Sequence, residues 1–380
     1  MSRILPFLIF VPIALSLVGG MHYYVWARLV RDTHLPPLAA LLLTLLIVAL
    51  GLSIPLAMIA SRVFHASFRP GLWVIFVWMG VGFLFVAFLG VADAGRLLGT
   101  LVQRMRSPLP VDPAKRLFLA RSLAVGVGGV VAGLSALGVR NALGAVQVKE
   151  VEVRLRGLPA ALAGFKLVQI SDVHVGALLR KDWVGQVVDR IRSLSPDLVA
   201  ITGDLVDGTV DELREQVAPL ARLEAKHGVF FSTGNHDHYS GADAWCAHLP
   251  TLGVQPLRNR RVSIAPGLEL AGIDDPSGAP DLTKALAGRD PSLALVLLAH
   301  QPRQFAEAAR NGVGLTLSGH THGGQIWPFS WLVALAQPYL AGLHARGESQ
   351  LYVSRGTGFW GPPMRVLAPA EITLIRLQPA

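Results

Sequence analysis

The residues with the clearest chemical potential lie near the C-terminus, in segment 317–325, whose sequence is LSGHTHGGQ. His320 and His322 are two residues apart and follow an apolar run at 313–317, which predicts a buried strand ending in a loop. The glycines on both sides of this pair allow a sharp turn and a close approach of the backbone to a ligand. Two imidazoles at this spacing can face one metal ion or two neighbouring ions.

Four further clusters of acidic, amide and imidazole side chains follow apolar runs upstream. These runs, at 166–170, 198–202, 229–233 and 294–299, predict buried strands. In open α/β sheets, ligands bind beyond the carboxyl ends of the strands, so the clusters are expected to converge on one edge. The polar side chains of interest are Asp172, His174, Asp204, Asn235, His236, Asp237, His300, His320 and His322.

Two aspartates, one asparagine and four histidines of this set are suited to metal binding, and no thiolate accompanies them. Mixed imidazole and carboxylate ligands suit zinc, iron or manganese. Seven ligands exceed the needs of one four-coordinate ion and suit two ions about 3.5–4 Å apart that share a carboxylate. Such a pair lowers the pKa of a bound water from ~15.7 toward about 7, which supplies a hydroxide nucleophile for displacement at phosphorus. A further histidine beside the metals could protonate the leaving alcohol.

In order and spacing, these motifs resemble the five blocks of the calcineurin-like metallophosphoesterases, over roughly residues 160–377. The resemblance implies a four-layer α/β/β/α sandwich and a metal-dependent phosphoric ester hydrolase. The later segments 323–325 (GGQ) and 355–358 (RGTG) look like the membrane-anchored or exported bacterial branch of that family. The blocks are Asp172-x-His174, Gly203-Asp204, Gly234-Asn235-His236-Asp237, His300 and Gly319-His320-x-His322.

The resemblance also implies a role for each residue. One metal ion would be held by Asp172, His174 and His322, and the other by Asn235, His300 and His320, with Asp204 bridging the two. His236 would orient the phosphate and act as the general acid, with Asp237 steering it. Three other polar residues are expected to be ordinary hydrogen-bonded groups at strand ends, namely Asp207, His238 and Asp275.

The composition separates a membrane region from this catalytic part. The chain has 380 residues, of which 52% are hydrophobic and 16% charged, with a mean hydropathy of +0.48. These values are too apolar for one soluble domain and too polar for a protein buried entirely in a membrane. The first third contains four apolar segments longer than the roughly 20 residues that cross a bilayer core. The expected division is a transmembrane region at 1–140, with spans at 4–27, 35–61, 70–92 and 117–139, a linker and first strand at 141–157, and the metallophosphoesterase domain at 158–380.

The topology is predicted from basic residues in the short loops. The connection after the third span is the most basic, with Arg96, Lys115 and Arg116 among its residues, which predicts a cytoplasmic location. The catalytic domain would then lie on the outer, periplasmic side of a bacterial inner (plasma) membrane. Lys115 and Arg116 precede an apolar segment rich in glycine and alanine, which also resembles a twin-arginine export signal with Lys as its first residue; an ordinary cytoplasmic flank is the alternative.

The charge and the cysteine content exclude several other classes. The net charge is +9 and the pI about 10.2, but many basic residues flank apolar spans, where lipid headgroups and topology account for them. No basic patch is interleaved with aromatic residues, so nucleic acid is not an expected partner. The single cysteine, Cys246, excludes an internal disulfide framework and a cysteine-rich zinc site. The expected partners are the lipid bilayer and a phosphate-ester substrate, and the oligomeric state is open.

The second two-thirds alternates predicted strands with predicted helices, which is typical of an α/β architecture. An alternating apolar pattern at 148–155 predicts a half-buried first strand. The remaining predicted strands are 268–273, 351–354 and 372–377, and the predicted helices are 181–193, 210–226, 242–249, 282–287 and 302–311.

Two questions about function stay open at the level of sequence. The favoured function is a membrane-anchored two-metal phosphoesterase acting on a phosphate ester, with a lipid or cell-envelope phosphate among the expected substrates. The alternatives are a catalytically silent scaffold or sensor, and a cytoplasm-facing pyrophosphatase for a nucleotide-linked lipid precursor. The aromatic residues Trp327, Phe329, Trp331 and Trp360 are expected either to pack in the core or to form an apolar lip that rests on the bilayer.

Overall fold

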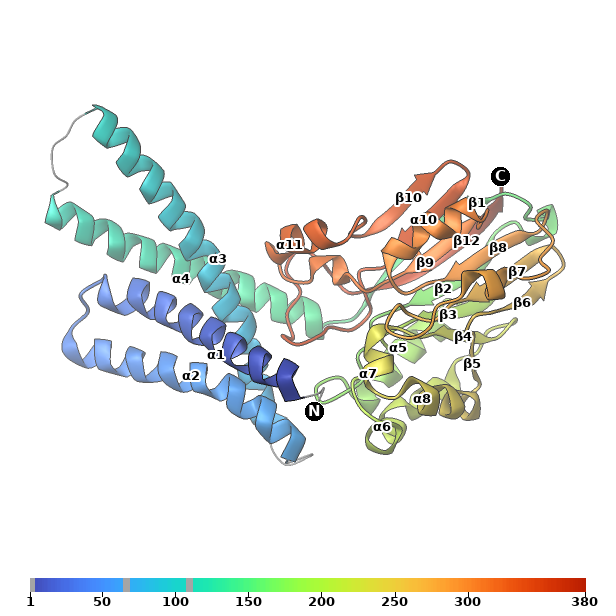
Figure 1. Cartoon of the computed structure of the whole chain (residues 1–380), viewed down its shortest axis with the longest axis horizontal. Helices are drawn as coiled ribbons and strands as arrows, with labels where there is room; N and C mark the ends of the chain where they lie inside the picture. The colour runs from blue at the N-terminus through green and yellow to red at the C-terminus, as the bar shows by residue number, and fades with distance from the viewer. Residues whose placement is uncertain (1–3, 64–68, 107–111) are drawn as a thin grey trace. The chain divides into compact units, whose positions relative to one another are not determined.

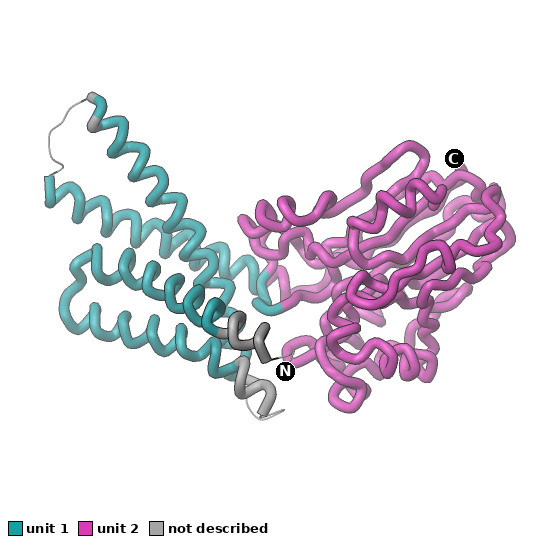
Figure 2. The backbone as a smooth tube through the Cα atoms, viewed as in Figure 1, with its two compact units in different colours: residues 1–139, 361–364 teal, residues 140–360, 365–380 magenta. Residues whose placement is uncertain are grey.

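The chain divides into two compact units in a computed structural model that describes residues 4–63, 69–106 and 112–380 (Figures 1 and 2). Unit 1 comprises residues 1–139 together with 361–364, and unit 2 comprises residues 140–360 and 365–380. Unit 1 contains the N-terminal helices, and unit 2 contains all the strands of the described chain.

Long apolar helices dominate unit 1. They are α1 (Ile4–Trp26), the π-helical turn η1 (Ala27–Arg31), α2 (Pro37–Val63), α3 (Arg69–Arg106) and α4 (Pro113–Leu143). Within the described residues, three segments are long and apolar enough to cross a membrane: Pro37–Ala57, Gly71–Gln103 and Pro113–Leu143. They cover the second, third and fourth predicted spans. The first predicted span, 4–27, coincides with α1, although some of its side chains lie outside the described residues.

The side chains of unit 1 are arranged as expected for helices surrounded by lipid. Val25, Val30, Ile47 and Leu89 pack together inside, whereas many large apolar side chains, such as Leu45, face outward. Several polar side chains between the helices are paired with one another, which is favourable where no water can bind them.

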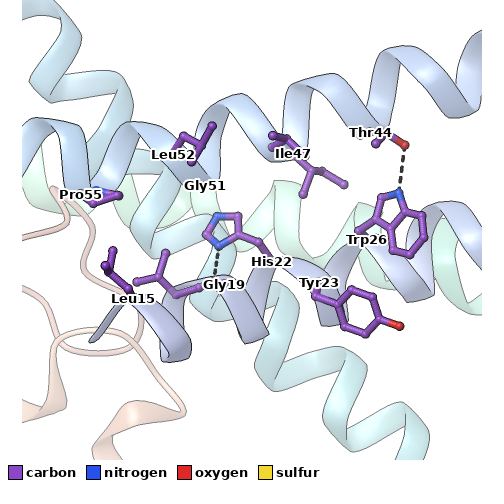
Figure 3. Close-up of a pocket in the computed structure, with 12 residues that line it drawn as sticks. Leu15, Gly19, His22, Tyr23, Trp26, Thr44, Ile47, Gly51, Leu52 and Pro55 are labelled. Carbon is purple, nitrogen blue, oxygen red and sulfur yellow. Dashed lines mark hydrogen bonds between the residues drawn. The ribbon is translucent and has the colours of Figure 1, made fainter. Parts of the chain in front are cut away.

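The polar pairs of unit 1 include a histidine beside a cavity of about 360 Å³ between α1 and α2 (Figure 3). The Nε1 atom of Trp78 donates to Nε2 of His22 at 2.9 Å, and Nδ1 of His22 lies 2.7 Å from the carbonyl oxygen of Val18. Nearby, Trp26 Nε1 donates to the hydroxyl of Thr44 at 2.9 Å. Both aromatic donors are therefore satisfied by side chains of neighbouring helices.

Unit 2 is built from two mixed six-stranded sheets (Figure 1). The first has the order β1-β12-β2-β3-β4-β5, in which only the β12–β2 pair is antiparallel. Its strands are β1 (Gln147–Leu155), β12 (Glu371–Pro379), β2 (Phe165–Ile170), β3 (Leu198–Thr202), β4 (Val229–Ser232) and β5 (Val254–Pro256).

The second sheet has the order β10-β11-β9-β8-β7-β6, with antiparallel pairs at its two edges and parallel pairs between them. Its strands are β10 (Gly342–Arg346), β11 (Ser349–Val353), β9 (Leu315–Ser318), β8 (Ala294–Leu298), β7 (Leu268–Gly272) and β6 (Arg260–Ala265).

Alternation along each strand divides the apolar side chains between two cores. Leu198 and Ala200 of β3 belong to the core between the sheets, whereas Val199 and Ile201 face the helices on the outer side. Those helices are α5 (Lys181–Arg192), α6 (Val210–Val217) and α8 (Ala242–His248). The other sheet packs against α9 (Leu282–Leu286) and α10 (Phe305–Arg310). The central strands β3, β4 and β8 are covered on both faces and are therefore almost entirely apolar.

Most predicted elements are present, with two informative differences. The helix predicted at 210–226 ends at Val217 and continues as a 3₁₀ segment at Ala218–Arg222, because Pro219 has no N–H to donate. The apolar segment after His322 contains α11 (Phe329–Ala336), which has no buried residue, so packing of this helix in the core is the wrong interpretation. A further short helix, α7 (Asn235–Tyr239), follows β4 directly.

Candidate metal centre

Five loops bring the predicted residues together at one end of the two sheets. Asp172 and His174 follow β2, Asp204 follows β3, and Asn235 opens α7 after β4. His300 follows β8, and His320 and His322 follow β9. All of these residues are buried except His320, which is partly buried. The carboxyl ends of parallel strands thus supply every member of the cluster, as expected for an α/β sheet.

The backbone is held in an uncommon conformation at five of these residues. Their φ angles are positive, a region that side chains other than glycine rarely adopt. Such a conformation costs on the order of 1–3 kcal/mol and persists only where the surrounding structure enforces it. The five account for half of the ten such non-glycine residues in the described chain: Asp172 (52°), His174 (51°), Asp204 (51°), His320 (69°) and His322 (51°).

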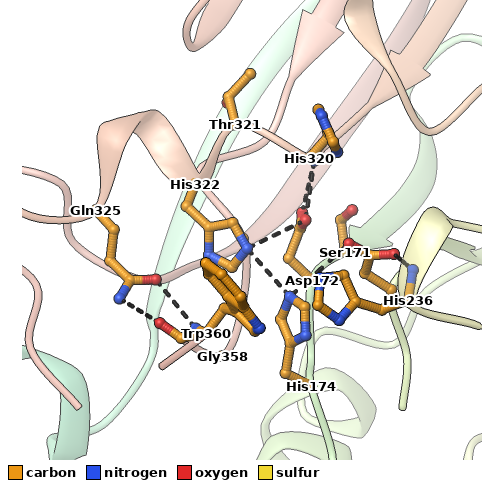
Figure 4. A network of polar contacts seen from close by, with 12 residues as sticks. Ser171, Asp172, His174, His236, His320, Thr321, His322, Gln325, Gly358 and Trp360 are labelled. Carbon is orange, nitrogen blue, oxygen red and sulfur yellow. Dashed lines mark hydrogen bonds and ion pairs between the residues drawn. The ribbon is translucent and has the colours of Figure 1, made fainter. Parts of the chain in front are cut away.

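The first group consists of Asp172, His174 and His322, whose ligand atoms lie within 4.8 Å of one another (Figure 4). The Nε2 atoms of the two histidines are 3.1 Å apart, and Nε2 of His322 is 3.5 Å from Asp172 Oδ1. Nδ1 of His174 lies 3.1 Å from both carboxylate oxygens of Asp207. A proton on Nδ1 of His174 is shared with Asp207, which leaves the Nε2 lone pair of His174 directed at the other two residues of the group.

The second group consists of Asp204, His300 and His320, joined by Asn235. Nδ1 of His300 donates to the carbonyl oxygen of Thr202 at 2.9 Å, so its Nε2 carries the lone pair. This Nε2 lies 3.1 Å from Asp204 Oδ2. On the other side of the group, Nδ1 of His320 lies 2.9 Å from Asn235 Oδ1.

Asp204 lies between the two groups. Its Oδ2 atom is 3.1 Å from Nε2 of His300 in one group and 3.9 Å from Nε2 of His174 in the other. Its Oδ1 atom accepts the backbone N–H of His236 at 2.8 Å, which fixes the carboxylate in this orientation. One carboxylate therefore faces both sets of ligands.

The residues fit metal ions because their acceptor atoms face one another without donors. Nε2 of His300 is buried and has no hydrogen-bond donor, yet it points at a carboxylate. Burial lowers the pKa of both His174 and His300, but the neighbouring carboxylates outweigh this effect. Asp207 raises the pKa of His174 to about 9, and Asp204 raises that of His300 to about 10. Burial raises the pKa of Asp172. The cluster therefore needs positive charge, which metal ions supply in place of protons.

Asp207 contributes a contact that the sequence analysis did not assign. Its Oδ1 atom is 2.7 Å from Nδ1 of His236, and its carboxylate also contacts His174. Partial burial opposes ionisation of Asp207, but His174 and His236 more than offset it and lower its pKa. The only signal in the sequence was its position three residues after Asp204 in the same loop.

Asp237 has a different place from the predicted one beside His236. The fully buried carboxylate accepts backbone N–H groups from Asp204 (2.8 Å), Leu205 (2.9 Å) and Gly234 (2.8 Å). The contact with the His236 ring is made by Asp207 instead. Asp237 therefore holds the loops after β3 and β4 together. The other two polar residues expected to be structural, His238 and Asp275, bind Thr233 and Gln301 outside the two metal groups.

An aromatic residue lies beside the His236 ring (Figure 4). The ring of Trp360 is 5.5 Å from that of His236 and is 56% exposed. The Gln325 amide fixes the Trp360 backbone by donating to its carbonyl oxygen (2.9 Å) and accepting its N–H (3.1 Å). The buried Arg365 donates to the Gly358 carbonyl oxygen at 2.8 Å, which anchors the preceding turn. The segment after β11 is thus held rigidly beside the cluster.

Comparison with known proteins shows what the chain resembles. Residues 165–324 match the model of the calcineurin-like phosphoesterase family. An uncharacterized metallophosphoesterase of Helicobacter pylori is 40% identical over 275 residues, which cover 70% of this chain and 73% of that protein. A transmembrane protein with metallophosphoesterase domain from Bos taurus is 36% identical over 397 residues, covering 97% and 88%. Among solved structures, the 5′-nucleotidase precursor of Thermus thermophilus gives a TM-score of 0.33 at 16% identity, over 56% of this chain and 54% of that chain.

Proposed function

Because this chain belongs to the calcineurin-like metallophosphoesterase family, we propose that its buried cluster binds two metal ions and hydrolyses a phosphate ester. Bound ions would supply an activated water as nucleophile and would neutralise charge on the phosphate oxygens. The observation that carries the proposal is the buried Nε2 of His300, which faces Asp204 without a donor. The proposed ligand sets are Asp172, His174 and His322 for one ion and Asn235, His300 and His320 for the other, with Asp204 shared.

His236 is the proposed general acid. Its side chain is 20% exposed, so it can reach a substrate that approaches from solvent, and Asp207 holds its Nδ1 atom. In the protonated imidazolium form, Nδ1 of His236 donates to Asp207 and Nε2 carries the proton that would pass to the leaving oxygen. Asn235 presents a neutral oxygen, which limits negative charge beside an anionic substrate. Asp237 supports this arrangement through the backbone of Asp204 and Gly234.

The proposed substrate class is a phosphate ester carried by a lipid or another component of the cell envelope. Trp331, Leu332 and Leu335 on α11 are 63%, 56% and 86% exposed, which is a large apolar surface for a water-soluble domain. The chain also carries three helices suited to a bilayer, so the same bilayer is the proposed occupant of this surface. Only residues 144–146 separate α4 from β1, so the connection between membrane helix and catalytic unit is short.

We also propose that the chain belongs to the membrane-anchored or exported bacterial branch of the family and that α1 is a fourth span. The proposed fold of the chain has a four-layer order of helices and sheets, with domain boundaries near residues 140 and 158. The proposed location is a bacterial inner membrane with the catalytic unit outside. Support comes from Arg28, Arg96 and Arg116, which line one cavity in unit 1, because basic residues mark the cytoplasmic end of a helix bundle.

The test of the proposed function is hydrolysis of bis-p-nitrophenyl phosphate by the purified full-length protein, with and without added manganese. We expect metal-dependent turnover that Asp204→Asn abolishes, because this change weakens the shared ligand. Asp189→Asn is the matched control, since Asp189 forms an exposed ion pair with Arg222 and should leave turnover unchanged. If the metal-loaded protein shows no turnover of this ester or of other phosphate esters, the scaffold or sensor function is correct instead.

A further inference from the structure

A polar cavity of about 420 Å³ lies within unit 1, and no residue of the metal centre lines it. Its wall is formed by η1 and the turn after it, by α3, and by the first turns of α4. Arginine is the dominant charged residue in this wall, with one carboxylate and one histidine. The polar lining residues are Arg28, Asp32, His34, Arg96 and Arg116.

One side of the cavity is held by a network of charged side chains. Arg28 donates to Asp32 at 2.5 Å and to Asp93 at 2.8 Å, and Tyr24 donates to Asp93 at 2.6 Å. Asp93 is the only acidic residue of α3. An acidic side chain within an apolar membrane helix costs free energy unless it is paired. Asp93 is paired with Arg28 and thereby orients it.

The turn between α1 and α2 is also fixed, because α4 binds its backbone. Arg121 donates to the carbonyl oxygen of Thr33 at 2.9 Å and to that of His34 at 3.0 Å. The arginine thereby joins two segments that are 87 residues apart in sequence. The cavity therefore has a fixed wall on the side of α4 as well.

Two arginines of the lining retain unused hydrogen-bonding capacity. Arg96 approaches Asp93 only to 3.8 Å, and Arg116 forms no ion pair with any side chain in the described part of the chain. Three guanidinium groups thus face one lining carboxylate, which leaves positive charge in the cavity. Basic residues that only mark the cytoplasmic side of a membrane need not line the same cavity, whereas Arg28, Arg96 and Arg116 all do.

We propose that this cavity binds the phosphate group of an anionic phospholipid. A guanidinium group presents two parallel N–H donors that match a phosphate, and basic pockets between membrane helices suit anionic headgroups. Leu117 and Ala120 line the same cavity, and Phe118 and Leu119 beside them are exposed and apolar, which suits acyl chains. This site is independent of the proposed hydrolysis, since none of its residues belongs to the catalytic unit.

The test measures phosphatidylglycerol retained by the full-length protein, extracted from equimolar phosphatidylcholine and phosphatidylglycerol vesicles, by native mass spectrometry. Each of these arginines would donate charge-assisted hydrogen bonds to the bound phosphate, so Arg96→Gln and Arg116→Gln should each lower retention about tenfold, which corresponds to about 1.4 kcal/mol. Lys115→Gln is the matched control, because Lys115 is adjacent to Arg116, loses the same charge and does not line the cavity. It should lower retention less than twofold.

The outcomes separate the proposal from its alternatives. Equal loss in all three variants would show general attraction to a charged surface, and no loss in any variant would show that the cavity holds no lipid; either result overturns the proposal. If inorganic phosphate titrated into phosphatidylcholine vesicles binds equally well and depends on Arg96 and Arg116, the ligand is a free anion and the lipid assignment is wrong. Circular dichroism and turnover of the soluble ester should be unchanged in the variants, which separates lipid loss from unfolding.

Discussion

At the scale of single residues, the metal centre is defined by which atoms lack a hydrogen-bond donor. Thr202 fixes the proton of His300 on Nδ1, and Asp207 does the same for His174. Each contact directs the Nε2 lone pair toward a buried carboxylate, an arrangement that is favourable only when positive charge lies between them. These outer contacts therefore fix the orientation of the side chains proposed as ligands.

The first residue-scale prediction concerns His236. His236→Ala should retain both metal ions, because the ring is not among the proposed ligands, but should lower turnover. The loss should be about 10²–10⁴-fold for esters with poor leaving groups and smaller for nitrophenyl esters, which need little protonation. Steady-state kinetics on an alkyl and a nitrophenyl ester of the same phosphate separates the two roles.

His227→Ala serves as the control for this prediction, because His227 packs against Phe165 outside the cluster. An equal loss on good and poor leaving groups would mean that His236 positions the phosphate and does not donate a proton.

The sequence identified the residues that cluster at the strand ends, but it did not reveal all of their contacts. The residue types of the five blocks pointed to a two-metal site because they occur at strand ends, where an α/β sheet exposes side chains. Asp207 was missed because its contact with His236 joins two loops, and no local pattern encodes that distance. For the same reason Asp237 was placed beside the ring of its neighbour, whereas its carboxylate turns back to the backbone of another loop.

At the scale of elements, the buried strands were predictable from the sequence, but the exposure of α11 was not. The runs that became β2, β3, β4, β8 and β9 are covered on both faces, so their predominantly apolar residues identify them. The same rule fails for α11, where apolar residues also dominate but none is buried. Composition alone does not distinguish a buried apolar helix from an exposed one.

The prediction at this scale is that α11 contacts the bilayer. Replacing Trp331 and Leu335 together by serine should weaken binding of the catalytic unit to phosphatidylcholine vesicles and lower turnover of a long-chain lipid phosphate. Turnover of the soluble ester should be unchanged, because neither side chain touches the metal ligands. Kinetics of the full-length protein on both substrates in the same vesicles measures the effect.

The thermal stability of the double variant provides the control for folding. If the variant unfolds, or loses turnover of both substrates equally, α11 supports the fold of the catalytic unit and the contact with lipid is wrong.

At the scale of the whole molecule, the chain combines membrane helices with a metallophosphoesterase unit. The apolar composition of the first third predicted the helices, and three of them meet the requirements for crossing a membrane within the described residues. The relative from Bos taurus, which aligns over 97% of this chain, is likewise described as a transmembrane protein with a metallophosphoesterase domain. The substrate and the orientation in the membrane stay beyond the sequence, because both depend on molecules outside the chain.

The central claim is that the cluster holds two metal ions that share Asp204. The most direct measurement is the metal content of the purified full-length protein after reconstitution with manganese, iron or zinc, by inductively coupled plasma mass spectrometry. The wild-type protein should contain close to two ions per chain, in line with two ligand groups and one shared carboxylate. Asp204→Ala should lose most of both ions, while Asp189→Asn retains them. A wild-type protein that binds no transition metal under these conditions would contradict the account.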